Sequence, residues 1–362
     1  MASDAMHAID AGGYRVIVGA GLRHELGVHV AAAARAHRYA LITDDQVAQH
    51  HAETALASLA RHGRTSVHVM RAGEAHKTRD TWATLTDELL EAGCGRDTTI
   101  VALGGGVVGD VAGFVAATFM RGVPVVQVPT SLLAMIDASV GGKTGVDTEA
   151  GKNLVGAFHP PAVVLVDVEF VRTLPVAHRR AGLAEAIKHG VIMDEEYLSR
   201  VETLAPDVIA GDASATLELV ARSVEIKASV VRADPREQGL RRILNFGHTL
   251  GHALEHASGY ELLHGEAVAI GMVLEARLAE RIGVAAQGTA QMIERVVRSS
   301  ALPVVRPAAL TSAAILAATR SDKKARGGAV AYALPSRIGA MAGAERDWAI
   351  EVGDAAVLEV LT

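Results

Sequence analysis

The sequence predicts a nucleotide-binding α/β domain built on a mainly parallel sheet, followed by an all-α domain. In the first half, short apolar strands alternate with helical patterns, which is typical of a parallel sheet covered by helices on both faces. Beyond about Leu174, long amphipathic segments replace the strands. We therefore predict two domains, residues 1–172 and 173–362, with the boundary near Val171–Pro175. A length of 362 residues agrees with two domains of roughly 150 residues or more.

The predicted strands are short runs rich in β-branched residues and bounded mostly by Gly, Asp or Pro. In the first domain they are Tyr14–Val18, Tyr39–Thr43, Ser66–Met70, Thr98–Leu103, Val125–Val128 and Val163–Asp167. Helical patterns lie between several of them, as at Gln46–His62 and Arg79–Ala92. In the second domain the predicted helices are Ala181–Met193, Ala215–Asp234, Gly247–Ser258, Gly265–Ile282 and Thr289–Ser300, with one strand at Ala329–Ala333.

Composition excludes several functional classes. The net charge is −6 and the sequence contains no long basic run, so a nucleic-acid partner is not expected. No apolar stretch has the length of a membrane span, and no signal peptide is recognisable, so no membrane partner is expected. Cys94 is the only cysteine, which rules out an internal disulfide and any zinc site built on several thiolates. We therefore expect a cytoplasmic enzyme that acts on a small molecule.

A glycine-rich segment follows the fourth predicted strand. Thr98–Leu103 leads into Gly104–Asp110 (GGGVVGD), and a helical pattern comes next. In a strand–turn–helix context, such glycines let the backbone approach a pyrophosphate, and the helix start offers unpaired N–H groups. A plain tight turn is the alternative. Because about three strands come earlier in the chain, the layout differs from a Rossmann domain, whose fingerprint follows the first strand.

A second segment, Gly73–Thr78, follows the strand Ser66–Met70 and combines a turn glycine, an acid and a cation. The acid could hold a ribose hydroxyl. From the residues alone, an ordinary charge pair at a solvated helix start explains the segment equally well.

Three segments of the second half carry residues of the types that bind metals. They centre on Glu185, on His248 with His252 four residues later, and on His264. One carboxylate and two neutral imidazoles suit Zn²⁺ with an open position for substrate, and also Co²⁺ or Fe²⁺. A single histidine is more often structural, but polar residues inside apolar helices need a partner or an ion. His252 could be a ligand or an acid/base, and we favour the acid/base.

Cations and polar residues recur at turns beside these motifs, which predicts a pocket for a substrate with phosphate and carboxylate groups. These residues are Arg121, Asp137, Lys143, Lys152, Asn153, Lys188, Lys227, Arg241, Asn245 and Lys324.

Together the segments resemble the 3-dehydroquinate synthases of the sugar-phosphate cyclase family. The resemblance covers about residues 73 to 324 and rests on motifs in the family's order. They are Gly73–Thr78, Gly104–Asp110, Arg121–Gly122, Pro129–Ala134, Asp137–Thr144, Gly151–Phe158, Gly182–Lys188, Lys227, Arg241–His252, His264–Glu266 and Asp322–Lys324. Departures are small: Ser131 stands where Thr is common, and His189 where an aromatic residue is common.

The resemblance implies bound NAD and a Zn²⁺ or Co²⁺ ion, in an active site between the two domains of a homodimer. It implies Glu185, His248 and His264 as metal ligands. The implied NAD contacts are Gly73, Glu74, Lys77, Thr78, Gly106, Val107, Val108, Gly109, Asp110, Thr130, Ser131, Lys143 and Lys152. The implied substrate residues are Asp137, Lys143, Asn153, Lys188, Lys227, Arg241, Asn245, His252 and Lys324, with Arg121 supplied across the dimer interface.

The implied reaction converts 3-deoxy-D-arabino-heptulosonate 7-phosphate (DAHP) into 3-dehydroquinate and phosphate, a phosphorus–oxygen lyase step of the shikimate pathway. NAD⁺ oxidises an alcohol transiently, phosphate leaves by elimination, the hydride returns, and an aldol step closes the ring. His252 and Asn245 are candidates for a proton relay, and the leaving phosphate is an alternative base.

Three other classes of function compete with this one: a sister cyclase, a dehydrogenase and a non-catalytic relative. A sister cyclase acting on the amino analogue of the substrate is compatible with the sequence. One acting on sedoheptulose 7-phosphate is disfavoured by Arg241, Asn245, His252 and Lys324, which fit a carboxylate. A metal-dependent dehydrogenase of the glycerol dehydrogenase group is disfavoured by Ser139–Thr144 and Gly151–Phe158. A non-catalytic relative is disfavoured because the full set of polar site residues is kept.

Overall fold

The computed structural model describes residues 6–149, 151–320, 325–326 and 329–362, and its chain divides into two compact units. The first consists of Met1–Pro175 and Gly211–Ala228, and the second of Val176–Ala210 and Ser229–Thr362. Residues 211–228, which were predicted to belong to the second domain, therefore group with the first unit.

The first unit is built on a seven-stranded sheet in the order β1-β2-β9-β6-β5-β3-β4. Only β1 pairs antiparallel, with β2, and the other neighbours are parallel, as predicted. The strands are β1 (His7–Asp10), β2 (Arg15–Gly19), β3 (Arg38–Asp44), β4 (Arg64–Met70), β5 (Thr98–Gly104), β6 (Val125–Pro129) and β9 (Val163–Asp167). All six predicted strands of this domain are present, and β1 is an addition.

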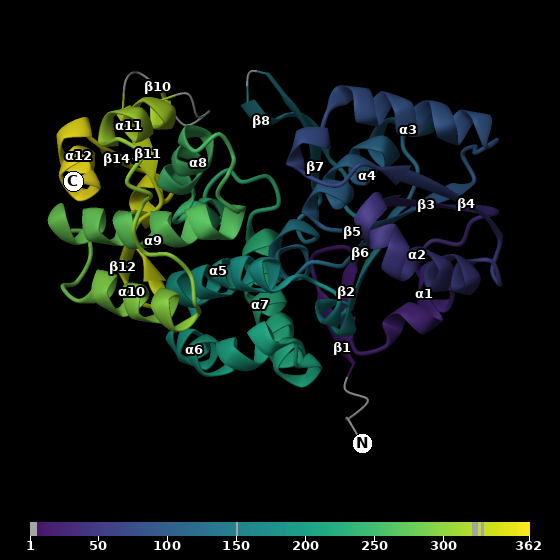
Figure 1. The fold of residues 1–362 in the computed structure, drawn as a ribbon, viewed down its shortest axis with the longest axis horizontal. Coiled ribbons are helices and arrows are strands. Elements are labelled where there is room, and N and C mark those ends of the chain that lie inside the picture. The colour runs from purple at the N-terminus through teal and green to yellow at the C-terminus, as the bar shows by residue number, and fades with distance from the viewer. Residues whose placement is uncertain (1–5, 150, 321–324, 327–328) are drawn as a thin grey trace. The chain divides into compact units, whose positions relative to one another are not determined.

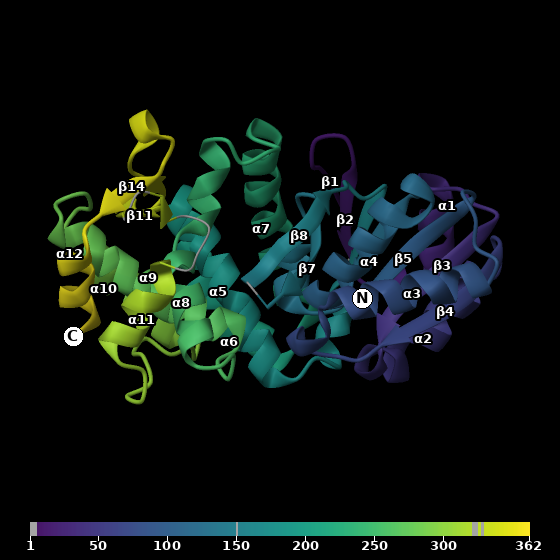
Figure 2. The same cartoon turned by 90° about the horizontal axis from the view of Figure 1, so that it is seen from above.

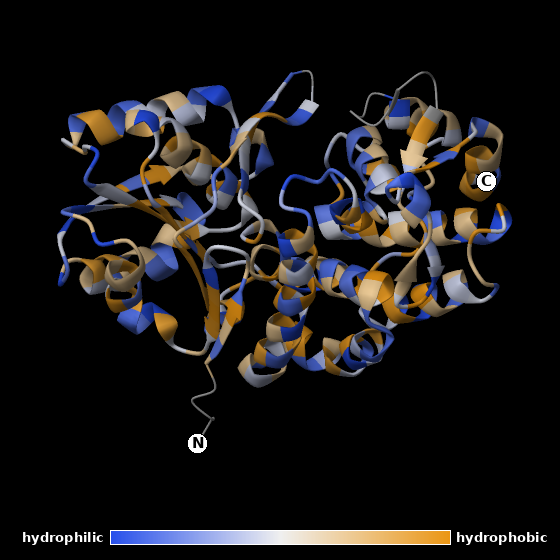
Figure 3. Ribbon diagram, turned by 180° about the vertical axis from the view of Figure 1, so that it is seen from behind, coloured by the Kyte–Doolittle hydropathy of each residue, from blue (hydrophilic) through white to orange (hydrophobic). Residues whose placement is uncertain are grey.

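Helices cover both faces of this sheet (Figure 1). On one face, α3 (Arg79–Glu91) and α4 (Gly106–Thr118) pack in a single core with Ile42 of β3 and Ile100 of β5. On the other face lie α1 (Leu26–Ala33) and α2 (Asp45–Leu59). Central strands such as β5 are buried along their whole length and carry mainly hydrophobic residues (Figure 3), as expected for a parallel sheet between two helical layers.

The glycine segment differs in one respect from the prediction. The helix after β5 begins at Gly106, so Gly106–Asp110 form the first turns of α4 instead of a loop before it. The turn itself is confined to Gly104 and Gly105. A Cβ atom on Gly104 would lie 2.5 Å from the Cβ of Val108, so only glycine permits this tight change of direction.

An antiparallel ribbon, β7 (Lys143–Thr148) with β8 (Gly151–Phe158), adds to the first unit. It was not predicted as strands. The predicted glycine turn precedes it, with positive φ angles at Gly141 and Gly142. Short helical turns complete the unit: η1 (Leu22–Glu25), η2 (Glu74–His76), η3 (Phe119–Arg121), the π-turn η4 (Ala134–Ala138) and η5 (Val168–Arg172).

The second unit is mainly helical, as predicted. Its helices are α5 (Val176–Met193), α6 (Glu195–Ala210), the end of α7 (Ala213–Ala233), α8 (His248–Ala257), α9 (His264–Arg281), α10 (Thr289–Ser299), α11 (Ser312–Arg320) and α12 (Asp354–Leu361), with the turns η6 (Leu240–Asn245) and η7 (Ala344–Arg346). The description all-α is too strict, because short strands form two small sheets. They are β10 (Ala325–Arg326), β11 (Ala329–Tyr332) and β14 (Ile350–Val352) in one, and β12 (Pro335–Arg337) and β13 (Ala340–Met341) in the other.

Helix α9 is the centre of this unit, and α5 and α8 lie beside it in both views (Figure 1 and Figure 2). It is buried over most of its length, which explains its apolar residues on all sides. Within the described residues, no helix is both long and apolar enough to cross a membrane.

Candidate active site

The residues predicted to bind NAD gather at the carboxyl edge of the parallel sheet. Gly104 ends β5, Thr130 and Ser131 follow β6, and Gly73 follows β4. The Thr130 N–H donates to the Gly104 carbonyl oxygen at 2.9 Å, which ties the two loops together. β3 and β5 are neighbours although β4 lies between them in sequence. Successive strands are therefore added toward one edge of the sheet up to β4, and toward the other edge from β5 onward. Such a reversal is where open α/β sheets bind ligands.

Lys77 is the buried centre of this region, with a relative exposure of 3%. Its ammonium group donates to Asp110 Oδ2 at 2.6 Å and to Asn153 Oδ1 at 2.6 Å. Burial lowers the pKa of Lys77, but the carboxylates of Asp110, Glu74 and Asp147 together outweigh burial and raise the pKa, so the ammonium keeps its proton. Burial also raises the pKa of Asp110. The cation of Gly73–Thr78 is therefore not at a solvated helix start, and it joins two further predicted site residues.

Other predicted NAD residues have defined partners nearby. Thr78 caps α3 by accepting the Thr81 N–H at 3.2 Å. Lys152 pairs with Glu74 at 3.2 Å. Gly106, Val107, Val108 and Gly109 lie in the first turns of α4, where N–H groups and the positive end of the helix dipole favour an anion.

Asp147, which the sequence analysis did not single out, connects these pieces. Its N–H donates to the Lys77 carbonyl oxygen at 2.7 Å, and its Oδ1 accepts the Asn153 N–H at 2.8 Å. Asn153 has a φ of 54°, an angle that needs such support. Asp147 lies between the motifs Asp137–Thr144 and Gly151–Phe158, and that position was the available signal.

Four more predicted substrate residues belong to the first unit. The Lys227 ammonium, in α7, pairs with Asp137 Oδ1 at 2.7 Å and also donates to the Asp137 carbonyl oxygen. Lys143 begins β7 and is exposed, and Arg121 ends η3 and is exposed with a φ of 66°. The structure thus brings Asp137 and Lys227 together.

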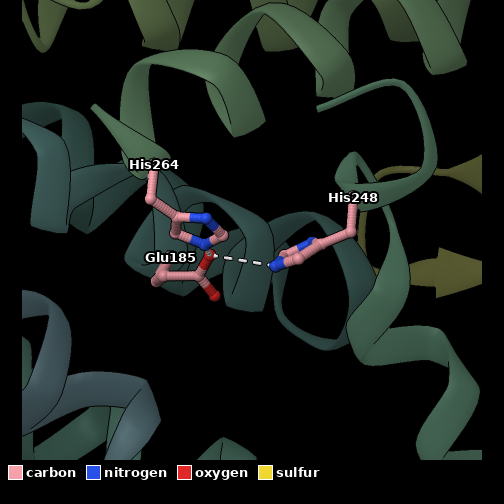
Figure 4. Close-up of side chains that lie close together, drawn as sticks. All are labelled: Glu185, His248 and His264. Carbon is pink, nitrogen blue, oxygen red and sulfur yellow. Dashed lines mark ion pairs between the residues drawn. The ribbon is translucent and has the colours of Figure 1, made fainter. Parts of the chain in front are cut away.

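In the second unit, Glu185, His248 and His264 meet from three different helices (Figure 4). One potential ligand atom from each lies within 4.8 Å of the others. Glu185 Oε1 is 3.5 Å from His248 Nε2 and 3.7 Å from His264 Nε2, and both rings point toward the carboxylate. Lys188, one helical turn after Glu185, pairs with Glu185 Oε2. The structure therefore assembles the predicted metal-ligand set.

Glycines let the three helices approach closely enough for these side chains to meet. A Cβ atom on Gly265 would lie 1.8 Å from the carbonyl oxygen of Ala181 in α5. One on Gly271 would lie 2.1 Å from the carbonyl oxygen of Gly247, which precedes α8. Any side chain at these positions would separate α9 from its neighbours.

The two histidines differ electrostatically. Burial, with the nearby Lys188 charge, holds the pKa of His248 well below its usual value, so its ring is neutral. Burial also lowers the pKa of His264, but the nearby Glu185 carboxylate and the hydrogen bond to Glu255 outweigh burial and raise the pKa to about 10.

Three further predicted residues lie in the same unit. The His252 ring centre is 5.3 Å from that of His248 and 5.9 Å from that of His264, so His252 adjoins the cluster. Arg241 is buried and donates to the Pro235 carbonyl oxygen at 2.8 Å. Asn245 donates to Glu237 Oε1 at 2.8 Å. Lys324, the remaining predicted substrate residue, lies outside the described residues.

Two buried carboxylates beside the cluster were missed by the sequence analysis. Glu255 in α8 is 3.2 Å from His264 Nδ1, and Glu275 in α9 accepts backbone N–H groups at the start of α8. Both stand within apolar helical patterns, so the reasoning already applied to Glu185 could have found them.

Sequence profiles identify the family. The profile of the 3-dehydroquinate synthase N-terminal region matches residues 67–181, and that of the C-terminal region matches residues 182–325. The chain belongs to the 3-dehydroquinate synthase family. A 3-dehydroquinate synthase of Symbiobacterium thermophilum is 48% identical over 90% of this chain and 92% of its own. One of Xanthomonas axonopodis pv. citri is 44% identical over 96% of this chain and 95% of its own.

Solved structures of sister enzymes share the fold of this family member. A 2-deoxy-scyllo-inosose synthase complexed with carbaglucose-6-phosphate, NAD⁺ and Co²⁺ has a TM-score of 0.90, at 25% identity over 99% of both chains. The 2-epi-5-epi-valiolone synthase of Streptomyces hygroscopicus, with NAD⁺ and Zn²⁺ bound, has a TM-score of 0.86, at 31% identity over 100% of this chain and 98% of its own. A probable glycerol dehydrogenase from Sinorhizobium meliloti has a TM-score of 0.62 at 17% identity over 99% of this chain and 97% of its own, which shows the fold alone.

Proposed function

We propose that this family member converts DAHP into 3-dehydroquinate and inorganic phosphate, as a phosphorus–oxygen lyase of the shikimate pathway. The observation that carries the proposal is the cluster of buried Glu185 and His248 with the partly exposed His264, and with Lys188 beside it. It occurs in a chain 48% identical to a relative named 3-dehydroquinate synthase. A buried acid, two imidazoles and a cation are costly to keep in a helical core unless they bind something.

The donor set fits a divalent metal ion. One carboxylate and two imidazoles bind Zn²⁺ or Co²⁺ and leave coordination positions for a substrate, and the two sister structures were solved with Co²⁺ and Zn²⁺. Glu185, His248 and His264 would hold the ion, which when bound polarises substrate oxygens and stabilises negative charge on them. The neutral ring of His248 is ready to offer its Nε2 lone pair.

The carboxyl edge of the sheet in the first unit fits NAD. The N–H groups at the start of α4 would bind the pyrophosphate, with Gly104 and Gly105 allowing it to approach the backbone. Glu74 begins the turn η2 after β4, where its carboxylate would bind a ribose hydroxyl, and Lys77 would hold Asp110 and Asn153 beside it. NAD when bound supplies a hydride acceptor and returns the hydride, so the reaction has no net redox change.

The cations predicted to contact substrate suit an acidic phosphorylated molecule. Lys143, Lys188, Lys227 and Arg241 would neutralise its carboxylate and phosphate groups. His252, whose ring is next to those of the two proposed histidine ligands, would move a proton at a substrate oxygen, and Asn245 would orient one. Asp137 and Asn153 orient Lys227 and Lys77 through the contacts described above.

We propose a homodimer in which Arg121 of one protomer binds phosphate in the other. The support is that Arg121 is exposed, and that Leu154 and Phe158 of β8 expose apolar side chains, at 41% and 56%. A cytoplasmic location stays a prediction from the sequence.

The test is to incubate the purified protein with NAD⁺, Zn²⁺ or Co²⁺, and DAHP, and to measure phosphate and dehydroquinate. Sedoheptulose 7-phosphate and the amino analogue of DAHP serve as competing substrates. We expect phosphate release from DAHP without net NADH. If phosphate is released with neither Zn²⁺ nor Co²⁺, the proposal is refuted. A faster reaction with one of the competing substrates would instead favour a sister cyclase.

A further inference from the structure

Glu255 occupies an unusual position beside the histidine cluster. It lies in α8, seven residues after His248, so both face the same side of the helix. Only 3% of Glu255 is exposed, and its Oε2 is 3.2 Å from Nδ1 of His264 in the neighbouring helix α9. A buried carboxylate is costly in free energy, so its contact with a ring nitrogen of a proposed ligand calls for a physical reason.

The contact determines which nitrogen of His264 is available. A carboxylate next to Nδ1 accepts a hydrogen bond from it, so when the ring loses one proton the remaining proton stays on Nδ1 and the Nε2 lone pair is left for an ion. It is Nε2 that lies 3.7 Å from Glu185 Oε1. His248 shows the same arrangement in a weaker form, because its Nδ1 is 3.1 Å from the backbone carbonyl oxygen of Phe246.

We propose that Glu255 is a positioning residue for the metal site: it fixes the orientation and tautomer of His264 and makes that ring a stronger ligand. The proposal rests on Glu185, His248 and His264 being the metal ligands. The negative charge of Glu255 strengthens the hydrogen bond to Nδ1 and thereby the basicity of Nε2, which a backbone carbonyl cannot do to the same degree.

The experiment measures metal affinity and not turnover. Zn²⁺ affinity is determined by competition with a chromophoric chelator for the wild type and for Glu255→Gln and Glu255→Ala. The absorption spectrum of bound Co²⁺ is recorded for each. We expect about a 10- to 100-fold loss of affinity for Glu255→Ala, a smaller loss for Glu255→Gln, which retains an oxygen acceptor, and a shifted Co²⁺ band for both.

Glu261→Gln is the matched control, because Glu261 is an exposed glutamate in the connection between α8 and α9. Its Zn²⁺ affinity and Co²⁺ spectrum should equal those of the wild type. Thermal melting of each metal-free variant separates a folding defect from a ligand effect. If Glu255→Ala does not fold, the Zn²⁺ affinity and the Co²⁺ spectrum of Glu255→Gln still test the positioning role.

Glu185→Ala distinguishes the two proposals. If it leaves Zn²⁺ affinity unchanged, the proposed metal site itself is wrong. If it abolishes binding while both Glu255 variants bind as the wild type does, the site stands and the role of Glu255 is refuted. Glu255, His252 and His264 also have ligand atoms within 4.8 Å of one another. Binding of two ions by the wild type, one of them lost in Glu255→Ala, would make Glu255 a direct ligand and overturn the positioning role.

Discussion

The carboxylate of Glu275, in α9, accepts a hydrogen bond of 2.7 Å from the backbone N–H of Gly247, the residue that precedes α8. Its second oxygen accepts the Leu250 N–H, in the first turn of α8, at 2.9 Å. Glu275 is fully buried, at 0% exposure, and a negative charge at a helix start is favourable. Glu275 thus holds the start of α8, and with it the first residue of that helix, His248.

We expect Glu275→Ala to lower the free energy of unfolding by roughly 3 kcal/mol, because two buried N–H groups lose their acceptor. Urea denaturation of the metal-free protein measures this loss. Glu261→Ala removes an exposed carboxylate from the same region and should change stability little. A loss below about 1 kcal/mol for Glu275→Ala would show that water or another group replaces the carboxylate.

Gly265→Ala should weaken metal binding without removing a ligand. The new methyl group would meet the Ala181 carbonyl oxygen, so α9 must move away from α5 and His264 from Glu185. We expect Zn²⁺ affinity to fall at least about tenfold, since ligand geometry limits affinity. Gly353→Ala is the control, because Gly353 has a φ of −74° and no other atom near the added methyl group. Equal Zn²⁺ affinity in both variants would contradict the role of this close helix contact.

Sequence patterns predicted the parts of this molecule that depend on local chemistry. Buried parallel strands such as Val163–Asp167 could be predicted from the sequence, because both of their faces need apolar residues. The ribbon β7–β8 was missed because half of it is exposed and glycine-rich, with little periodicity. The pairing of Lys77 with Asp110, and of Glu255 with His264, joins residues from different elements, so no local spacing could predict either contact.

The stability of the first unit should depend on pH through His51. Its Nε2 is 2.8 Å from Thr173 Oγ1, and its ring contacts Phe170 edge-on at 4.7 Å. Burial first, and then the charges of His50 and Arg23, lower the pKa of His51 from 6.5 to about 4. Between these values the unfolded chain binds more protons than the folded one. The contribution of the neutral His51 ring to the free energy of unfolding is therefore complete above pH 6.5, and it is lost as the pH falls to about 4.

His51→Gln tests this dependence. At pH 7 the wild type should be more stable than the variant, and we expect this advantage in unfolding free energy to fall by about 1 kcal/mol between pH 7 and pH 4.5. The expected change is modest because the ring is partly exposed. Urea denaturation at the two pH values measures it. An NMR titration of His51 near its ordinary pKa of 6.5 would contradict the expectation.

Metal binding should release a proton from His264. Burial lowers the pKa of this ring, but the nearby Glu185 carboxylate and the hydrogen bond to Glu255 raise the pKa to about 10, so the ring is protonated at pH 8 before the ion arrives. An ion can bind Nε2 only after that proton leaves. Zn²⁺ binding is measured by calorimetric titration at pH 8 in two buffers of different ionisation enthalpy. The difference between the two binding heats should correspond to the release of about one proton per bound ion. Glu255→Ala should release less, because one of the groups that raises the pKa is gone. Equal binding heats in the two buffers would show that no proton is released. His264 would then be neutral before the ion binds, which would contradict the expectation.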